Sequence, residues 1–285
     1  MENINFYFSD TNFYCYNLVN KLPSEIKRFI MINRDAQENF RLSYRNKIAN
    51  WYNGYLHIAI IFGIGFSLLY IYLQYIDQPS IFDFLTIPIT FIAANFFEWY
   101  LHKVIMHKPQ KKIGLRAIYQ RHTHNHHNFF TDNEMRFRDS DDWRVTVFPP
   151  YALIVFVLMS SIGLVTLSFI FNSNVGWFFI FTTTSIYLLY EFMHFCCHVK
   201  ENWFVRNCPL INTIRRHHSV HHNNQLMREI NLNLTFPIAD YIFGTSDLNR
   251  GFFGHLLNGY STKYQKNNLR TNPKAPGYNN DSPNF

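Results

Sequence analysis

The sequence is poor in charged residues, and the shortage is confined to two long stretches of the chain. Asp, Glu, Lys and Arg together make up 16% of the 285 residues, below the roughly 25% typical of soluble domains. No Lys or Arg occurs between Lys47 and Lys103, and none occurs between Arg144 and Lys200. The net charge of +7 therefore belongs to the segments outside these stretches, and it does not indicate a nucleic-acid-binding face.

Several motifs that define other protein classes are also absent. The four cysteines form no CxxC pair, so we expect reduced thiols rather than a disulfide framework or a zinc knuckle. The chain has no GxGxxG nucleotide fingerprint, no His-Pro-Gly-Gly haem motif and no His-Glu dipeptide of a metalloprotease. These absences argue against a nucleotide-binding fold, a fused haem domain and a metalloprotease of the HExxH type.

Four apolar segments are long enough to cross a bilayer, which requires about 20 residues of helix. They cover about 55–76, 81–101, 148–171 and 175–195. The turns at 77–80 and 172–174 hold no basic residue, so both should face away from the cytoplasm. These features predict an all-α integral membrane protein with four transmembrane helices in two hairpins. Both termini should then be cytoplasmic, in a bacterial inner membrane or the endoplasmic reticulum.

The same pattern divides the chain into three parts. Residues 1–53 should form a cytoplasmic N-terminal helical region, and residues 54–262 a membrane-embedded catalytic domain. Residues 263–285 are rich in Asn, Pro and Gly toward their end and should form a disordered tail. The acidic cluster at 139–142 could brace a site, but we expect it to mark a solvated helix start.

Histidine is the most informative residue type, because 12 of the 14 histidines gather in clusters beside the apolar segments. All these clusters fall on the predicted cytoplasmic side, where a helical cap could join them in one dimetal site. Neutral imidazole is a common ligand for Zn, Fe, Ni and Cu, and affinity alone does not choose among these metals. The spacings that suit metal binding are His102/His107, His122/His126/His127, His194/His198 and His218/His221/His222.

Other residues near these clusters have predicted supporting or structural roles. Glu98 and Glu191 each lie one helical turn before a histidine, where a carboxylate could accept an N–H from a ligating imidazole. Direct ligation by either carboxylate is the alternative. Four histidines do not fit the ligand scheme and are expected to be bystanders or structural residues: His57, His124, His217 and His255.

The ordered set HxxxxH, HxxxHH, HxxxH and HxxHH resembles the fatty acid hydroxylase/sterol desaturase superfamily of integral-membrane enzymes. The run from Ile230 to Thr245 resembles that family's segment after its last histidine box. The resemblance implies two iron ions, with Zn a possible substitute in vitro, and O2 as co-substrate. Asp240 and Asn231 are candidates to support the ligands by position, although packing roles explain them equally well. The implied ligands are His102, His107, His122, His126, His127, His194, His198, His218, His221 and His222.

We therefore predict an oxidoreductase that hydroxylates a C–H bond of a lipid: a fatty acyl chain, a sphingolipid or a sterol-like molecule. A metal site facing lipid tails meets unactivated C–H bonds, and the metal carries such chemistry. The expected partners are a lipid from the bilayer and an electron donor such as cytochrome b5 or ferredoxin. A lipid desaturase on the same scaffold is the main alternative. A membrane metal-binding or transport protein is less favoured, because its ligands should lie near the bilayer midplane.

Overall fold

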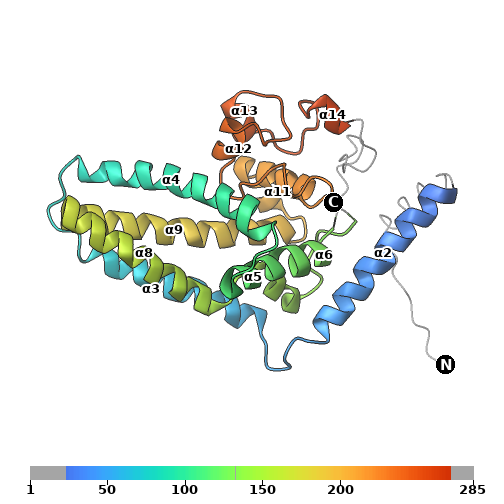
Figure 1. Cartoon of the computed structure of the whole chain (residues 1–285), viewed down its shortest axis with the longest axis horizontal. Coiled ribbons are helices and arrows are strands. Elements are labelled where there is room, and N and C mark those ends of the chain that lie inside the picture. Colours follow the sequence, from blue (N-terminus) through green and yellow to red (C-terminus); the bar gives the residue numbers. More distant parts are fainter. Residues whose placement is uncertain (1–23, 132, 271–285) are drawn as a thin grey trace.

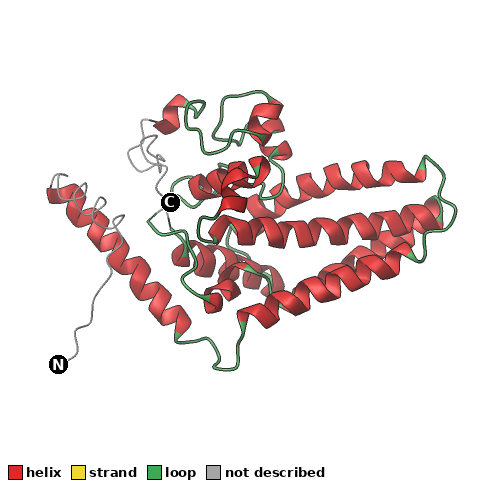
Figure 2. Cartoon of the chain, turned by 180° about the vertical axis from the view of Figure 1, so that it is seen from behind, coloured by secondary structure: helices red, strands yellow, loops and turns green. Residues whose placement is uncertain are grey.

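The computed structural model describes residues 24–131 and 133–270, and these residues fold almost entirely into helices. Figure 2 shows no strand in this part of the chain, which contains only two isolated β-bridges. The predicted all-helical class is confirmed. The long helices are α2 (Ser24–Arg45), α3 (Gly54–Leu73), α4 (Thr86–Tyr100), α8 (Pro150–Ile170), α9 (Ser173–His198) and α11 (Pro209–His221).

Shorter elements connect these helices, and all of them except the one between α3 and α4 gather at one end of the long bundle (Figure 1). Two of them, η2 and η3, are π-helices, and the others are short α- or 3₁₀-helices. They are η1 (Asp83–Leu85), η2 (Leu101–Met106), α5 (Ile113–Tyr119), η3 (Gln120–His126), α6 (His127–Phe129), η4 (Ser140–Asp142), α7 (Trp143–Thr146), α10 (Trp203–Asn207), α12 (Ile238–Ile242), α13 (Phe252–Leu256) and α14 (Asn267–Arg270).

Four helical stretches are long and apolar enough to span a membrane: Gly54–Leu73, Asp83–Met106, Ser140–Ile170 and Ser173–His198. Their outer surfaces expose large apolar side chains, including Phe169 at 91% exposure and Phe66 at 60%. Such a surface is unfavourable in water and fits contact with lipid. The chain is therefore an integral membrane protein by these criteria, with the spans close to the predicted segments.

Helix α9 lies at the centre of the bundle, between α4 on one side and α3 with α8 on the other (Figure 1). Both α3 and α4 make their most extensive helix contacts with α9, so α9 joins the four spans. Gly65 permits the close approach of α3, because a Cβ there would lie 2.5 Å from a methyl carbon of Leu188. The tight packing around α9 matters because this helix carries two of the clustered histidines.

The two predicted turns lie together at the end of the bundle opposite the histidines. The amide of Asp77 donates to Asn174 Oδ1 at 3.0 Å, and Asn174 Nδ2 donates to the Asp77 carbonyl at 2.8 Å. Asn172 Nδ2 also donates to Asp83 Oδ1 at 2.9 Å. These bonds tie the α3–α4 connection to the α8–α9 connection and fix the ends of the four spans relative to one another.

Some details differ from the sequence-based expectations. Residues 263–270 fold back on the protein, since Leu269 is buried against Val220 and Leu226. Residues 1–23 of the predicted N-terminal region and residues 271–285 of the predicted tail lie outside the described residues. The expected solvated role of the acidic cluster is wrong for Asp142, which is fully buried and accepts two hydrogen bonds from Arg45 at 2.8 and 2.7 Å.

Candidate metal centre

Two π-helices place histidines that are five residues apart on a common face. A π-helix closes its hydrogen bonds from residue i to residue i+5, and single π-turns are frequent at functional sites. His102 lies in η2 and His107 directly follows it, and their rings stack with centroids 5.0 Å apart and an interplanar angle of 20°. In η3, His122 and His127 approach to 3.2 Å between their Nε2 atoms. The HxxxxH spacing thus corresponds to one π-turn.

These four residues and one histidine of α11 form what we call the first histidine group. Nε2 of His122 lies 2.9 Å from Nε2 of His102 and 3.2 Å from that of His107. Nε2 of His107 is 3.0 Å from Nε2 of His221. One ligand atom from each residue lies within 4.8 Å of all the others in this group: His102, His107, His122, His127 and His221.

The second histidine group is built mainly on ordinary α-helices, where residues four apart share a face. His194 of α9 approaches His126 to 3.0 Å between Nε2 atoms, and His198 approaches His218 of α11 to the same distance. Ligand atoms of these four residues also lie within 4.8 Å of one another. We include His222, whose Nε2 lies 2.9 Å from that of His218 and 3.1 Å from that of His126.

The two groups adjoin and draw on the same two segments. The π-helix η3 leads from His122, in the first group, to His126, in the second. At the end of α11, His221 belongs to the first group and His222 to the second, because successive helical residues diverge by about 100°. The rings of His127 and His222 stack at 4.2 Å across the boundary. The structure therefore brings together all ten predicted ligands.

Backbone carbonyls fix the protonation of four rings. A carbonyl oxygen only accepts hydrogen bonds, so each facing Nδ1 must carry the proton and leave a lone pair on Nε2. In these four rings the Nε2 atom points into the histidine groups. The pairs are His102 Nδ1 with Leu232 O at 2.5 Å, His221 with Ile230 at 3.0 Å, His198 with Met135 at 2.8 Å and His222 with Phe130 at 2.6 Å.

The Nε2 lone pairs that converge in each histidine group are suited to binding a cation. Lone pairs on neighbouring Nε2 atoms repel one another, whereas a cation between them would turn each into a ligand. Burial also favours the neutral ring: it lowers the pKa of His107 to about 2 and that of His222 to about 3. All ten rings are at most 5% exposed. This donor set could hold one metal ion in each group, and neutral nitrogen ligands suit a transition metal.

Glu98 contacts the backbone of a loop where an imidazole contact was expected. Its carboxylate accepts hydrogen bonds from the amides of Leu234 and Thr235, the latter at 3.0 Å, and from the Thr235 hydroxyl at 2.5 Å. Glu191 likewise accepts from the Phe148 amide at 3.3 and 3.2 Å. Within the described residues, neither carboxylate has a hydrogen bond to a histidine, so both support the backbone around the site.

Asp240 supports the same loop as Glu98 and acts through it on the first group. Its carboxylate accepts from the amides of Leu232 at 3.0 Å and Asn233 at 2.7 Å. Because Leu232 O is the acceptor for His102, Asp240 helps to orient that ring indirectly. Burial raises the pKa of Asp240.

Asn231 connects the loop to α11 from the left-handed region, with φ of 56°. Its Nδ2 donates to the His217 carbonyl at 3.1 Å and to Asp247 Oδ1 at 3.0 Å. The Asp247 amide donates back to Asn231 Oδ1 at 3.0 Å. Asn231 therefore fixes the start of the loop against the helix that carries three of the histidines.

The four remaining histidines lie outside both groups, as expected. His124 is exposed and packs edge-on against Tyr119, whereas His217 is buried but has no hydrogen-bond partner for either ring nitrogen among the described residues. His57 and His255 bond elsewhere, to Tyr52 and Phe148 and to the Gly251 carbonyl respectively.

The sequence did not reveal the carbonyl acceptors. It also did not reveal Thr123, whose hydroxyl lies 3.2 Å from His107 Nδ1.

The chain matches the family model of the fatty acid hydroxylases over residues 87–245, more than half of its length. It therefore belongs to the fatty acid hydroxylase/sterol desaturase superfamily. Comparison with the curated proteins and with the solved structures gave no significant match.

Proposed function

We propose that this protein is a membrane oxidoreductase that hydroxylates a C–H bond of a lipid at a histidine-ligated di-iron centre. The observation that carries the proposal is the convergence of ten buried imidazoles at one end of an apolar four-helix bundle, within a fatty acid hydroxylase domain. When bound, iron would supply the activation of O2 that an unactivated C–H bond requires. The ten residues would hold the metal ions, and their burial would keep bulk water away from them.

An apolar groove between α4 and α9 supports a hydrocarbon chain as the substrate. It has a volume of about 320 Å³, and it contains two hydroxyl groups. Both hydroxyls bond to carbonyls of their own helix, Thr182 to Phe178 at 2.7 Å and Ser185 to Phe181 at 2.8 Å. The groove therefore offers an apolar wall. Its lining residues are Ile87, Pro88, Phe91, Phe181, Thr182, Ser185, Ile186 and Leu189.

The groove approaches the second histidine group along α9. Leu189 precedes His194 by five residues, which corresponds to about 7.5 Å of helix rise. A chain lying in the groove would thus extend toward the metal centre from within the bilayer. This geometry supports an acyl or similarly long apolar substrate.

We also propose that the histidine end of the bundle and both termini face the cytoplasm. The support is the absence of Lys and Arg from the two turns at the opposite end. Single cysteines placed at Ser80 and Ser173 should be labelled only from the non-cytoplasmic side. Labelling from the cytoplasm at either position would reverse this orientation.

An external carrier such as cytochrome b5 or a ferredoxin is the proposed electron donor. Three basic residues, Lys47, Arg121 and Arg144, line a cleft of about 250 Å³ beside η3, and their charge would attract an acidic partner. Replacing the exposed Lys47 with Glu should lower kcat/KM for the donor several-fold at low salt and much less at high salt. Turnover that does not depend on salt would remove the electrostatic argument.

The deciding experiment is untargeted lipid mass spectrometry of cells that express the wild-type chain, with a donor and iron supplied. A His126→Ala/His127→Ala variant is the control, because it removes one imidazole from each group. A wild-type-specific gain of one oxygen in a lipid would support hydroxylation and identify the substrate. A loss of two hydrogens would favour the desaturase alternative. Purified protein that binds no iron would contradict the di-iron proposal.

A further inference from the structure

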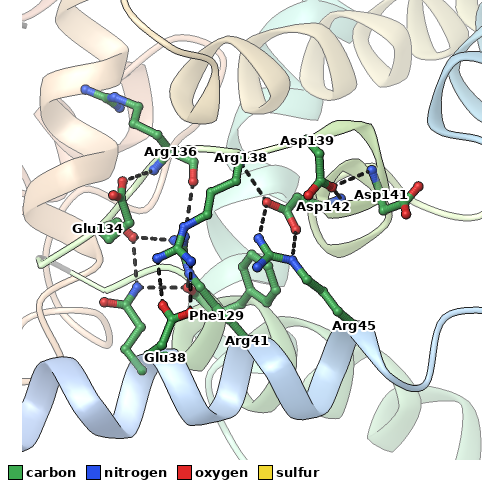
Figure 3. A network of polar contacts seen from close by, with 11 residues as sticks. Glu38, Arg41, Arg45, Phe129, Glu134, Arg136, Arg138, Asp139, Asp141 and Asp142 are labelled. Carbon is green, nitrogen blue, oxygen red and sulfur yellow. Dashed lines mark hydrogen bonds and ion pairs between the residues drawn. The ribbon is translucent and has the colours of Figure 1, made fainter. Parts of the chain in front are cut away.

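Helix α2 lies outside the residues that match the family, yet it contacts the segment that supports the second histidine group (Figure 3). Two of its side chains, Gln37 at 6% exposure and Arg41 at 0%, are buried against residues 129–136. An arginine is almost never fully buried unless it has partners. The partners of Arg41 therefore indicate what the helix does.

The Arg41 guanidinium bridges three backbone carbonyls of that segment. Its Nε donates to Phe129 O at 2.8 Å, its Nη2 to Glu134 O at 2.8 Å and its Nη1 to Arg136 O at 3.4 Å. The planar group presents several donors in a fixed geometry, which a lysine cannot reproduce. One side chain thus joins the two ends of this turn.

Gln37 lies one helical turn before Arg41 and donates to two of the same carbonyls, those of Phe129 and Glu134. Its Nε2 donates to Phe129 O and to Glu134 O, each at 2.9 Å, and its Oε1 accepts from the Thr131 hydroxyl at 2.8 Å. Each of these carbonyls therefore receives a hydrogen bond from both α2 side chains.

The carbonyls between these anchor points face the histidines. Phe130 O accepts from His222 Nδ1 at 2.6 Å, and Met135 O accepts from His198 Nδ1 at 2.8 Å. Phe130 has extended backbone, where successive carbonyls point to opposite sides, so its carbonyl and that of Phe129 face different partners. Its ring also stacks on His198 with centroids 4.0 Å apart.

We propose that Gln37 and Arg41 are positioning residues for the second histidine group. By holding the carbonyls of residues 129, 134 and 136, they fix those of Phe130 and Met135, which orient the rings of His222 and His198. The carbonyls that orient rings of the first group belong to residues 230 and 232, and neither accepts a hydrogen bond from Gln37 or Arg41. This inference rests on the metal-binding part of the proposed function and on no particular reaction.

The test is Zn²⁺ affinity of the purified full-length chain in detergent, measured by competition with a chromophoric chelator. Arg41→Met is introduced into two backgrounds, His107→Ala, which disables the first group, and His218→Ala, which disables the second. Loss of a residue that orients a ligand typically weakens metal binding 10–100-fold. We expect that loss in the His107→Ala background and no change in the His218→Ala background.

A control at an exposed ion pair of the same helix separates positioning from general weakening. Arg138→Met removes an ion pair with Glu38 whose side chains are 45% and 40% exposed, and it should leave Zn²⁺ affinity unchanged in both backgrounds. If Arg41→Met does not fold, Arg41→Lys keeps the charge without the planar fork and should show the same site selectivity with a smaller loss. Gln37→Ala should also act only on the second group.

Two outcomes would overturn the inference: equal losses of affinity in both backgrounds, or no loss in the His107→Ala background. They are distinguishable from failure of the proposed function. If the wild-type protein binds two equivalents of Zn²⁺ but Arg41→Met causes no selective loss of affinity, only the role of α2 is contradicted. Wild-type protein that binds no metal contradicts the metal centre itself.

Discussion

His217 and His218 are adjacent on α11 and equally buried, at 0% and 1% exposure, but only His218 belongs to a histidine group. Nε2 of His218 lies 3.0 Å from that of His198 and 2.9 Å from that of His222. We predict that His218→Leu greatly weakens metal binding, whereas His217→Leu does not. Leucine replaces either ring with an apolar side chain that fills much of its volume, so the two variants are a matched pair.

The magnitudes follow from the surroundings of each ring. Four-ligand zinc sites bind with about 10–16 kcal/mol, or about 2.5–4 kcal/mol per ligand if shared equally. Loss of His218 should therefore lower the affinity of the second group by roughly 10²–10³-fold. The ring nitrogens of His217 have no hydrogen-bond partner among the described residues. Its replacement would remove a desolvation cost of about 1–3 kcal/mol, so folding should be unaffected or slightly stabilised.

Metal content after dialysis against a chelator, together with the thermal stability of each purified variant, would measure these effects. We expect His217→Leu to retain two equivalents of metal and His218→Leu to retain one. Equal loss of metal in the two variants would show that α11 presents a different face to the centre. The reasoning would also fail if His218→Leu kept both equivalents with unchanged affinity.

Two further predictions concern stability. Gly65→Val should lower the free energy of unfolding by about 1–3 kcal/mol, because the valine side chain would overlap Leu188. Gly63→Val is the control, because a side chain there would enter open space. Equal melting temperatures of the two variants would contradict the packing of α3 on α9. Burial alone would raise the pKa of Asp247, but the Arg216 guanidinium holds that pKa below its usual value. The ion pair therefore stabilises the protein fully above about pH 4 and progressively less below it. Asp247→Asn should therefore lower the free energy of unfolding by about 3–5 kcal/mol at neutral pH. In denaturation experiments this difference from the wild type should become smaller in acid, and a difference that stays constant with pH would contradict this account.

The sequence predicted the membrane spans well because their signal is simple. Long windows without Lys or Arg coincide with the helices α3, α4, α8 and α9, and the short turns coincide with the connections. Burial in lipid imposes this composition on the whole helix surface, so the signal does not depend on tertiary contacts.

The clustering of the histidines in a dimetal site was also predictable, but the assignment of each histidine to one of the two groups was not. The spacing of His102 and His107 gives about 140° of separation on an α-helix, at 100° per residue, which would direct the rings apart. The π-helices remove that separation. Only the structure could assign His221 to one group and His222 to the other.

The roles of the acidic residues were harder to predict for a related reason. Glu98 and Glu191 have the spacing of imidazole acceptors, but their carboxylates bond to backbone amides. Backbone donors and acceptors are present at every position, so they leave no signature in the sequence. Arg41 illustrates the same limit, because its three partners are carbonyls.

The two groups thus share one design but differ in what supports them. In each, carbonyls of a short loop orient imidazoles through Nδ1, and buried or half-buried polar side chains hold the loop. The first loop is held by Glu98 and Asp240, which lie inside the residues that match the family, and the second is held by α2, which lies outside them. A metal centre whose two halves are supported by separate parts of the chain can lose one half without the other. The helix before the membrane spans is therefore part of the catalytic apparatus that we propose, although it provides no ligand.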